Sequence, residues 1–487
     1  MSFKNHLLLL ASAALLAACG RTATVTQIDI IPEPVFQMQK EGSYTLDRSI
    51  AVSTQGLGQN SPTAKYIMNS LRHAHFRPSL VARSEESDID LIINDTINPE
   101  LGDEGYLLEV RQTGIRLSAN TETGLFYAYQ TFSQMVPSDV LEHTYSSITL
   151  PECTILDYPR FAWRGAHLDA STHHFPVKFI KKYLDLMATY KMNRFHWGLG
   201  DSDASTLSPD SISDTTDSIV YEDLGSRYTE EEIAEVVEYA ASLGITVVPE
   251  EGMELVWDDE YSETRPGEEL KRIVAARTSL QAGQQAARAG CRVVMCPDEW
   301  CRLDFYQADR RYQPRATDGQ ITLAKAYEFD PAPQGTNKYV EQCILGGQCN
   351  LWTEFIETPS QAEYMLLPRL LAISESLWSP RDAKNWNHFR KKVELQKSRL
   401  DSKGYSYCEG SFTPLFRVTR VDDHTMNIAI ETEVPSTYIF YTTDSTTPTR
   451  HSQVYLGPIN LRRGTHIKIQ PVYKDTERDS VYEFVIK

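Results

Sequence analysis

The sequence predicts a multidomain α/β protein with an α+β N-terminal domain, a (β/α) barrel of the TIM type and a C-terminal β-sandwich. Three observations lead to this prediction. Strand-like runs with few helices occupy residues 28–155, alternating strands and helices fill residues 156–408, and residues 413–487 are rich in strands alone. Alternating strands and helices are typical of a parallel sheet, and the middle region is long enough for a barrel.

The middle region carries the clearest helix and strand signals. A helix is predicted over residues 177–190, where apolar residues recur at helical spacing. A second helix begins at Thr229, which forms a capping box with Glu232, and ends before Gly244. Six strands are predicted, over Arg164–Asp169, Asn193–Leu199, Ile245–Glu250, Arg272–Ala276, Arg292–Cys296 and Ile344–Cys349.

Both flanking regions are predicted from strand patterns. In the first, residues 89–93 and 106–110 are predicted strands, residues 114–118 continue the pattern, and a helix begins near Thr123. In the last, the apolar run Tyr438–Thr443 ends in a turn that contains proline. The predicted segments are a signal peptide over 1–18, a linker over 19–27, the N-terminal domain over 28–155, the barrel over 156–408 and the sandwich over 413–487.

Charge and composition exclude several classes of function. The chain has 48 Lys and Arg against 66 Asp and Glu, for a net charge of −18. A nucleic-acid partner is not expected, because its binding surface would be basic. The sequence also has no phosphate-binding loop and no set of His and Cys at metal-ligand spacing, so it predicts no cofactor and no metal site.

The first 18 residues resemble a secretory signal peptide. Lys4 precedes an apolar run from Leu7 to Leu16 that is too short to span a membrane, and small residues lead from there to Cys19. This ending resembles a bacterial lipobox, in which the cysteine is acylated and begins the mature chain. We expect an exported bacterial lipoprotein of the cell envelope, anchored in a membrane through Cys19. An ordinary signal peptide with a coincidental cysteine is the alternative.

Carboxylates and tryptophans follow the predicted barrel strands, at the end of a barrel where ligands bind. Asp169 and Asp201 come after the first two strands, and Trp352 and Glu354 come after the last. Aromatic faces stack on sugar rings, while carboxylates bind hydroxyls or act as acids and bases, so this pattern favours a carbohydrate site. Structural roles are the alternative: Asp169 could hold a loop, His196 could be a structural histidine, and Trp352 could cap the barrel.

Longer stretches of the chain resemble one known family. Residues 158–165, 190–197 and 348–354 resemble the first, second and last strands of the barrel of family-20 β-N-acetylhexosaminidases. Residues 31–34 resemble the accessory domain in front of that barrel, and residues 441–459 resemble the sandwich often found behind it. The resemblance covers nearly the whole mature chain. It implies action on terminal N-acetyl-hexosamine residues of glycans.

The resemblance also implies a mechanism, in which the acetamido oxygen of the substrate attacks the anomeric carbon. In the family, an Asp orients this acetamide and an adjacent Glu protonates the leaving oxygen, both within a His-x-Gly-Gly-Asp-Glu stretch after the fourth strand. No such stretch occurs here, and only about 40 residues separate Glu250 from Val293. We therefore expect the fourth and fifth strands and a pocket tryptophan to be missing, which leaves an incomplete barrel of about six strands.

Single residues also depart from the family pattern. Thr172 stands where the resemblance implies an arginine for sugar hydroxyls, and Arg302 stands where it implies the tyrosine that holds the acetamide. Other positions match the implied substrate-binding residues: Asp201, Asp304, Trp352 and Glu354.

Three interpretations of the function remain open. If the adjacent pair Asp259 and Glu260 replaces the lost acids, the chain is a working exo-hexosaminidase. If that pair lies in a solvated acidic loop, the chain is a non-catalytic lipoprotein that binds glycans or serves as a scaffold. A decaying gene product is the third interpretation. The sequence favours a catalytically impaired relative, with N-acetyl-hexosamine glycans and a membrane as its partners.

Overall fold

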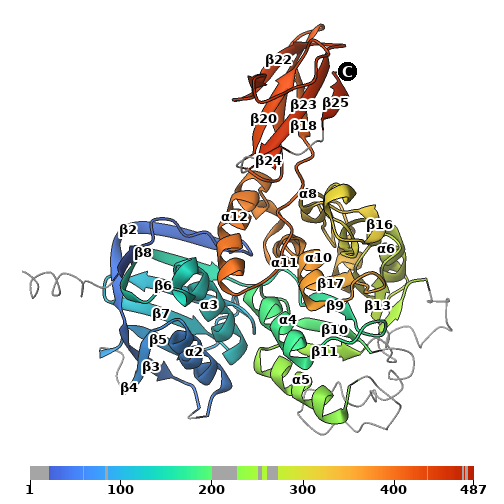
Figure 1. Cartoon of the computed structure of the whole chain (residues 1–487). Coiled ribbons are helices and arrows are strands. Elements are labelled where there is room, and N and C mark those ends of the chain that lie inside the picture. Colours follow the sequence, from blue (N-terminus) through green and yellow to red (C-terminus); the bar gives the residue numbers. More distant parts are fainter. Residues whose placement is uncertain are drawn as a thin grey trace, which may run out of the picture.

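The computed structural model describes residues 21–486 except 59, 83–85, 200–227, 250–254, 260–272, 436, 474–475 and 478–480. An accessory domain, a barrel-like domain and a small C-terminal sandwich follow one another along the chain (Figure 1). This order confirms the predicted fold class. Within the described ranges, no helix is both long and apolar enough to cross a membrane.

The accessory domain is an eight-stranded mixed sheet with two helices on one face (Figure 1). Its elements are β1 (Arg21–Thr24), β2 (Phe36–Asp47), β3 (Ser49–Gln55), α2 (Pro62–His73), β4 (Arg77–Val81), β5 (Ile89–Ile93), β6 (Tyr106–Arg111), β7 (Gly114–Ala119), α3 (Glu122–Met135), the short 3-10 helix η2 (Ser138–Leu141) and β8 (Tyr145–Asp157). The strand order is β1-β8-β6-β7-β5-β3-β4, and β2 also pairs with β8. Most of α3 is buried, because it packs on the sheet and also contacts the barrel.

Strand β1 corrects the prediction of a linker over residues 19–27. Its residues pair in parallel with β8, with Thr22 opposite Ser147 and Thr24 opposite Thr149. The edge of a sheet carries unpaired backbone groups that recruit an extended segment, even one without an apolar pattern. The sequence of β1 therefore gave no strand signal, and the strand forms because β8 offers it backbone hydrogen-bond partners.

In its described residues, the barrel domain is built on one sheet of seven parallel strands. They are β9 (Trp163–Asp169), β10 (Arg194–Gly198), β11 (Thr246–Pro249), β12 (Leu255–Trp257), β13 (Ile273–Ala276), β14 (Arg292–Met295) and β17 (Ile344–Leu351). Their order is β11-β10-β9-β17-β14-β13-β12, so β11 and β12 form the two edges of the described sheet. A closed barrel of this type has eight strands.

The described residues thus form one barrel strand more than the six predicted. Residues Leu255–Trp257 pair in parallel with Ile273–Ala275 and add a strand that the sequence pattern did not reveal. Three residues are too few to show a strand period, and this strand depends on its partner for backbone hydrogen bonds.

A link of five residues, 250–254, joins the two edge strands β11 and β12. A parallel crossover with its helix needs at least ~10–12 residues, so the length of the link alone excludes a strand–helix unit there. The implied catalytic stretch followed such a unit. The catalytic stretch is therefore absent because the chain is too short at this point, and not because a few of its residues are substituted.

Helices cover the outside of the sheet (Figure 1). They include α4 (Val177–Thr189), α5 (Glu230–Ser242), α6 (Leu280–Arg288), α7 (Asp298–Cys301), α8 (Leu323–Tyr327), α9 (Lys338–Cys343), α10 (Pro359–Leu366), α11 (Arg369–Trp378) and α12 (Trp386–Ser402). The predicted capping box between Thr229 and Glu232 is confirmed at the start of α5. On α6, a Cβ added to Gly283 would lie 2.8 Å from the Cβ of Ala276, so glycine lets this helix approach the sheet.

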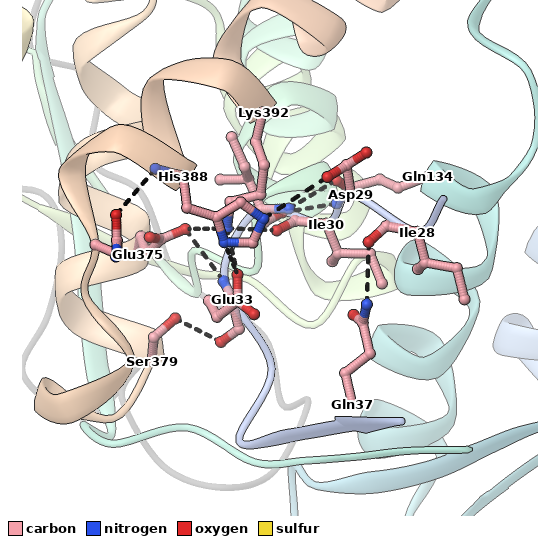
Figure 2. A network of polar contacts seen from close by, with 12 residues as sticks. Ile28, Asp29, Ile30, Glu33, Gln37, Gln134, Glu375, Ser379, His388 and Lys392 are labelled. Carbon is pink, nitrogen blue, oxygen red and sulfur yellow. Dashed lines mark hydrogen bonds and ion pairs between the residues drawn. The ribbon is translucent and has the colours of Figure 1, made fainter. Parts of the chain in front are cut away.

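The N-terminal segment fastens the accessory domain to the barrel helices through buried charges (Figure 2). Lys392 of α12 donates to the carboxylates of Glu33 at 2.7 Å and Glu375 at 3.0 Å, and to the carbonyl of Ile30 at 2.9 Å. The imidazole of His388 lies 3.6 Å from Glu33 as well. A continuous hydrophobic core extends from Ile28 in the accessory domain to Tyr405 after α12, so the two domains share one interior.

The C-terminal sandwich has two small sheets and its own core, as predicted. The strands are β18 (Leu415–Arg420), β19 (Thr425–Glu431), β20 (Tyr438–Thr442), β21 (Gln453–Val454), β22 (Ile459–Arg462), β23 (His466–Tyr473), β24 (Thr476–Glu477) and β25 (Tyr482–Val485). One sheet has the order β18-β19-β22, and β23 is central in the other. Buried Ile428, Ile439, Ile467 and Ile469 form the core between them.

Candidate functional site at the barrel mouth

Four ring side chains meet inside the barrel toward the carboxyl ends of its strands. The centroids of His167 and Trp352 lie 4.6 Å apart, those of His196 and Trp257 lie 5.4 Å apart, and those of Trp257 and Trp352 lie 5.6 Å apart. His196 belongs to β10 and Trp257 to β12, which are far apart in the strand order. The sheet is therefore rolled around a centre that these rings fill.

Trp257 partly corrects the expected loss of a pocket tryptophan. This residue lies two positions before Asp259 in the chain, and the structure places its indole against Trp352 inside the barrel. Trp352 itself is half-buried, so part of its ring remains accessible to a ligand. Two tryptophans thus lie at the mouth, the buried Trp257 and the partly exposed Trp352, and both contact histidines.

A short polar chain lies beneath these rings. The side-chain nitrogen of Gln348 lies 3.0 Å from Nδ1 of His196 and donates at 3.0 Å to the amide oxygen of Asn350. All three side chains are fully buried. This supports the structural interpretation of His196, because its imidazole is fixed by a neighbour on β17.

Asp169 has the loop-holding role that was its structural alternative. Its carboxylate accepts hydrogen bonds from the backbone and hydroxyl of Ser171, at 2.8 and 2.6 Å, and from the backbone of Thr353 at 3.3 Å. Burial alone would raise the pKa of Asp169, but these hydrogen bonds outweigh it and the pKa lies below its ordinary value. The residue is an ionised anchor between the loops that follow β9 and β17.

Arg277, which the sequence analysis did not single out, organises the other side of the mouth. Its guanidinium lies over the rings of Trp257 and Trp352, at 5.3 and 5.9 Å, and its Nε donates to Asp259 at 3.0 Å. Asp258 accepts from the backbone of Arg277 at 3.0 Å. Arg277 could have been found from the sequence, because it directly follows a predicted strand and a cation at that end of a barrel can also belong to a ligand site.

Arg277 decides the state of Asp259, the first member of the candidate catalytic pair. The hydrogen bond from Arg277 is the main reason why the pKa of Asp259 lies below its ordinary value. The carboxylate is therefore ionised near neutral pH and already bound to a guanidinium. Its candidate partner Glu260 lies outside the described residues.

Arg302 and Asp304 lie together where the family pattern implied a tyrosine and a carboxylate. The Nε of Arg302 is 3.2 Å from one oxygen of the almost fully buried Asp304 and 3.3 Å from the other. A terminal nitrogen of Arg302 also reaches Asp298 at 3.4 Å. The carboxylate expected to hold a sugar hydroxyl thus has a protein partner already.

The remaining candidates do not form one cluster. Glu354 is exposed, and Asp201 lies outside the described residues. His173, which follows β9 and was not among the predicted site residues, contacts the carbonyl of Thr353 at 2.9 Å, which is a loop contact. In the part of the chain that the structure describes, no group of three or more His, Cys, Asp or Glu side chains could hold a metal ion.

The comparisons with known proteins agree with this architecture. The model "Glycosyl hydrolase family 20, catalytic domain" matches residues 161–253 and 251–381, and "Glycosyl hydrolase family 20, domain 2" matches residues 27–158. The model "Fn3 associated" matches residues 428–486. A beta-hexosaminidase of Porphyromonas gingivalis is 26% identical, with 94% of this chain and 75% of that protein covered.

Solved structures show the same fold at low identity. The Streptomyces plicatus N-acetyl-beta-hexosaminidase in complex with Thio-NAglucal has 22% identity and a TM-score of 0.66, covering 79% of this chain and 97% of that one. An exo beta-N-acetylglucosaminidase of Vibrio harveyi has a TM-score of 0.63 over 79% of each chain. At this identity the likeness establishes the fold.

The fold and the family models place the chain in the glycoside hydrolase class of (β/α) barrels, with an accessory domain and a sheet that is one strand short in its described part. The two family-20 models together match most of the chain between residues 27 and 381. The chain belongs to this family and is a family-20 hexosaminidase-like protein.

The comparisons also locate the shortened region. The family model for the catalytic domain matches in two pieces that overlap at residues 251–253, inside the link between β11 and β12. The alignment with the Porphyromonas protein extends over 592 positions, although this chain has only 487 residues. More than a hundred positions of that relative therefore have no counterpart here.

Proposed function

We propose that this chain is a non-hydrolysing family-20 relative that binds N-acetyl-hexosamine-bearing glycans at the barrel mouth. The observation that carries the proposal is the pairing of Arg277 with Asp259. In the family an Asp orients the acetamide of the substrate, so Asp259 would need a free carboxylate to take that role. Its carboxylate is instead bound to a guanidinium, and the five-residue link leaves no room for the usual catalytic stretch.

Glycan binding is supported by what the mouth retains. Trp352 offers a partly accessible indole, and indoles stack on the apolar faces of sugar rings. Arg277 beside it can donate to sugar hydroxyls or to an acetamide oxygen. The relatives named above are hexosaminidases, which indicates the kind of glycan to test first.

The second candidate function is a scaffold without affinity for sugars. It is favoured by the packing of Trp352 against His167 and Trp257, because rings that fill the mouth leave less space for a ligand. The two candidates differ in what the indole of Trp352 does, so one substitution separates them.

Substitution of Trp352 by alanine is expected to weaken binding of N-acetylglucosamine and chito-oligosaccharides at least tenfold in calorimetry, while the melting temperature stays near that of the parent. The loss of a stacking surface, worth about 1.4 kcal/mol for a tenfold change, is the physical reason. The matched control is Trp300→Ala, a half-buried tryptophan on α7 outside this ring cluster. The scaffold function is supported if the parent protein binds no sugar at millimolar concentration. It is also supported if Trp352→Ala leaves sugar binding unchanged and lowers the free energy of unfolding by the ~3–5 kcal/mol typical of a core tryptophan.

We also propose that Cys19 anchors the protein to a membrane of the cell envelope. The lipobox-like sequence that ends at Cys19 supports this. Acyl chains attached to Cys19 would hold the protein on the bilayer, because their methylenes are buried in the membrane.

Substitution of Cys19 by serine is expected to move the protein from the membrane pellet to the soluble exported fraction. The thioether-linked acyl chains cannot form without the thiol. Fractionation with immunoblotting measures this, and Cys153→Ser, at a buried thiol in the accessory sheet, is the control that should stay in the pellet. A Cys19→Ser protein that remains in the pellet would disprove the anchor.

A further inference from the structure

We propose that a hollow between the accessory domain and the barrel binds a small organic anion that carries an apolar ring. The hollow has a volume of about 680 Å³. It lies between α2, α3 and η2 on one side and α4, α5 and α12 on the other, where the two domains face each other (Figure 1). None of the mouth residues lines it, so the proposal is independent of the proposed function.

Aromatic side chains from both domains form the walls. They are Tyr66, Phe76, Tyr129 and Phe132 from the accessory domain and Tyr239 and Tyr405 from the barrel. The rings of Tyr66 and Tyr129 lie 6.2 Å apart and nearly perpendicular, which leaves ring edges and faces for a further ring to pack against. An inorganic anion would gain nothing from such walls, whereas an organic ring would.

The charges at the rim are mostly positive. Lys182, Arg399 and Lys403 line the hollow, and Asp185 is the carboxylate among its lining residues. Asp185 accepts a hydrogen bond of 2.6 Å from the hydroxyl of Tyr239. Lys182 is already paired with Glu363 at 2.6 Å. The surplus positive charge therefore rests on Arg399 and Lys403.

These two cations differ in what holds them. The terminal nitrogens of Arg399 donate to the carbonyls of Ser133, Gln134 and Val136, so this guanidinium bridges the domains and is fixed in place. Lys403 follows directly after α12 and is exposed to solvent within the hollow. It is the cation whose ammonium can turn toward a ligand.

The electrostatic state of Lys403 supports an anionic ligand. Arg399 repels the ammonium of Lys403, and Asp185, which is already bonded to Tyr239, only partly offsets this repulsion. The two cations therefore lack a full counter-charge among the residues that line the hollow. A bound carboxylate would supply that counter-charge, while its ring fills the aromatic part. Ligand sites of a few hundred Å³ hold molecules of this size.

The test uses calorimetry on the soluble chain with three probes: 3-phenylpropionate, its neutral amide 3-phenylpropionamide, and acetate. We expect 3-phenylpropionate to bind with a Kd below about 1 mM, and both other probes to bind at least about tenfold more weakly. The amide lacks the charge and acetate lacks the ring. Equal binding of acid and amide, or no binding of 3-phenylpropionate up to about 10 mM, would overturn the proposal.

Variants locate the site. Lys403→Met is expected to weaken 3-phenylpropionate binding at least about tenfold. Lys403→Arg should keep most of the parent's affinity, because it keeps the positive charge. Lys391→Met, an exposed lysine on α12, is the matched control and should bind as the parent does. An unchanged affinity in Lys403→Met would contradict the assignment of the hollow. Circular dichroism of each variant confirms that it folds.

Discussion

The soluble chain, residues 20–487, is expected to hydrolyse aryl N-acetyl-β-hexosaminides at least ~10²–10⁴-fold more slowly than an intact family-20 enzyme, because the loss of a general acid alone has an effect of that size. The further loss of the group that orients the acetamide removes the positioning of the internal nucleophile, which adds to the deficit. Release of 4-nitrophenol from the N-acetylglucosaminide and N-acetylgalactosaminide measures the rate, with the Porphyromonas relative assayed beside it.

Control variants make this result interpretable. Asp259→Asn and Glu260→Gln each remove one member of the candidate acidic pair, and residual turnover should be the same in both as in the parent. Turnover within tenfold of the intact enzyme would refute the proposal. Loss of that turnover in Glu260→Gln would then assign the acid to the rebuilt pair.

Substitution of Lys191 by methionine is expected to destabilise the protein by about 3–5 kcal/mol, because it leaves the carboxylate of Asp157 buried without its cation. Both side chains are fully buried, and Nζ of Lys191 lies 2.8 Å from Asp157 and 2.8 Å from the hydroxyl of Tyr106. Asp157 also accepts from the indole of Trp378 at 2.9 Å. The pair therefore links the accessory domain, the barrel and α11, and urea unfolding followed by tryptophan fluorescence measures its contribution.

Two comparisons separate the charge from other effects. The backbone of Lys191 has a φ of 60°, and methionine carries the same left-handed strain there, so the substitution removes little besides the ammonium and its contacts. Lys181→Met breaks the solvent-exposed pair with Glu235 and should cost at most about 1 kcal/mol. Adding Asp157→Asn to Lys191→Met should recover part of the loss. A Lys191→Met cost as small as that of Lys181→Met would show that the buried pair does not hold the domains together.

Local sequence patterns predicted the elements that carry a strong signal of their own. The capping box of Thr229 and Glu232 fixed the start of α5, and apolar spacing gave α4 and six of the seven described barrel strands within a residue or two. Strands β1 and β12 were missed, because each is short and forms against a partner strand rather than from its own pattern.

At the mouth of the barrel, too, the sequence predicted the position of single residues but not their contacts. Sequence position after a strand identified Asp169 and Trp352 as residues at the correct end of the barrel, and the family resemblance identified Asp304. It did not reveal that Asp169 holds two loops or that Asp304 is paired with Arg302, since partners distant in sequence decide both.

The sequence by itself thus determined the order of domains, the parallel sheet and the absence of the implied catalytic stretch, because periodicity, turn residues and chain length are local properties. Tertiary structure alone decided the number of strands, the ring cluster around Trp257 and Trp352, and the ionised state of Asp259 beside Arg277. These features depend on which distant segments meet. A side chain's pKa and accessibility are set by its neighbours in space, and a linear pattern does not specify those neighbours.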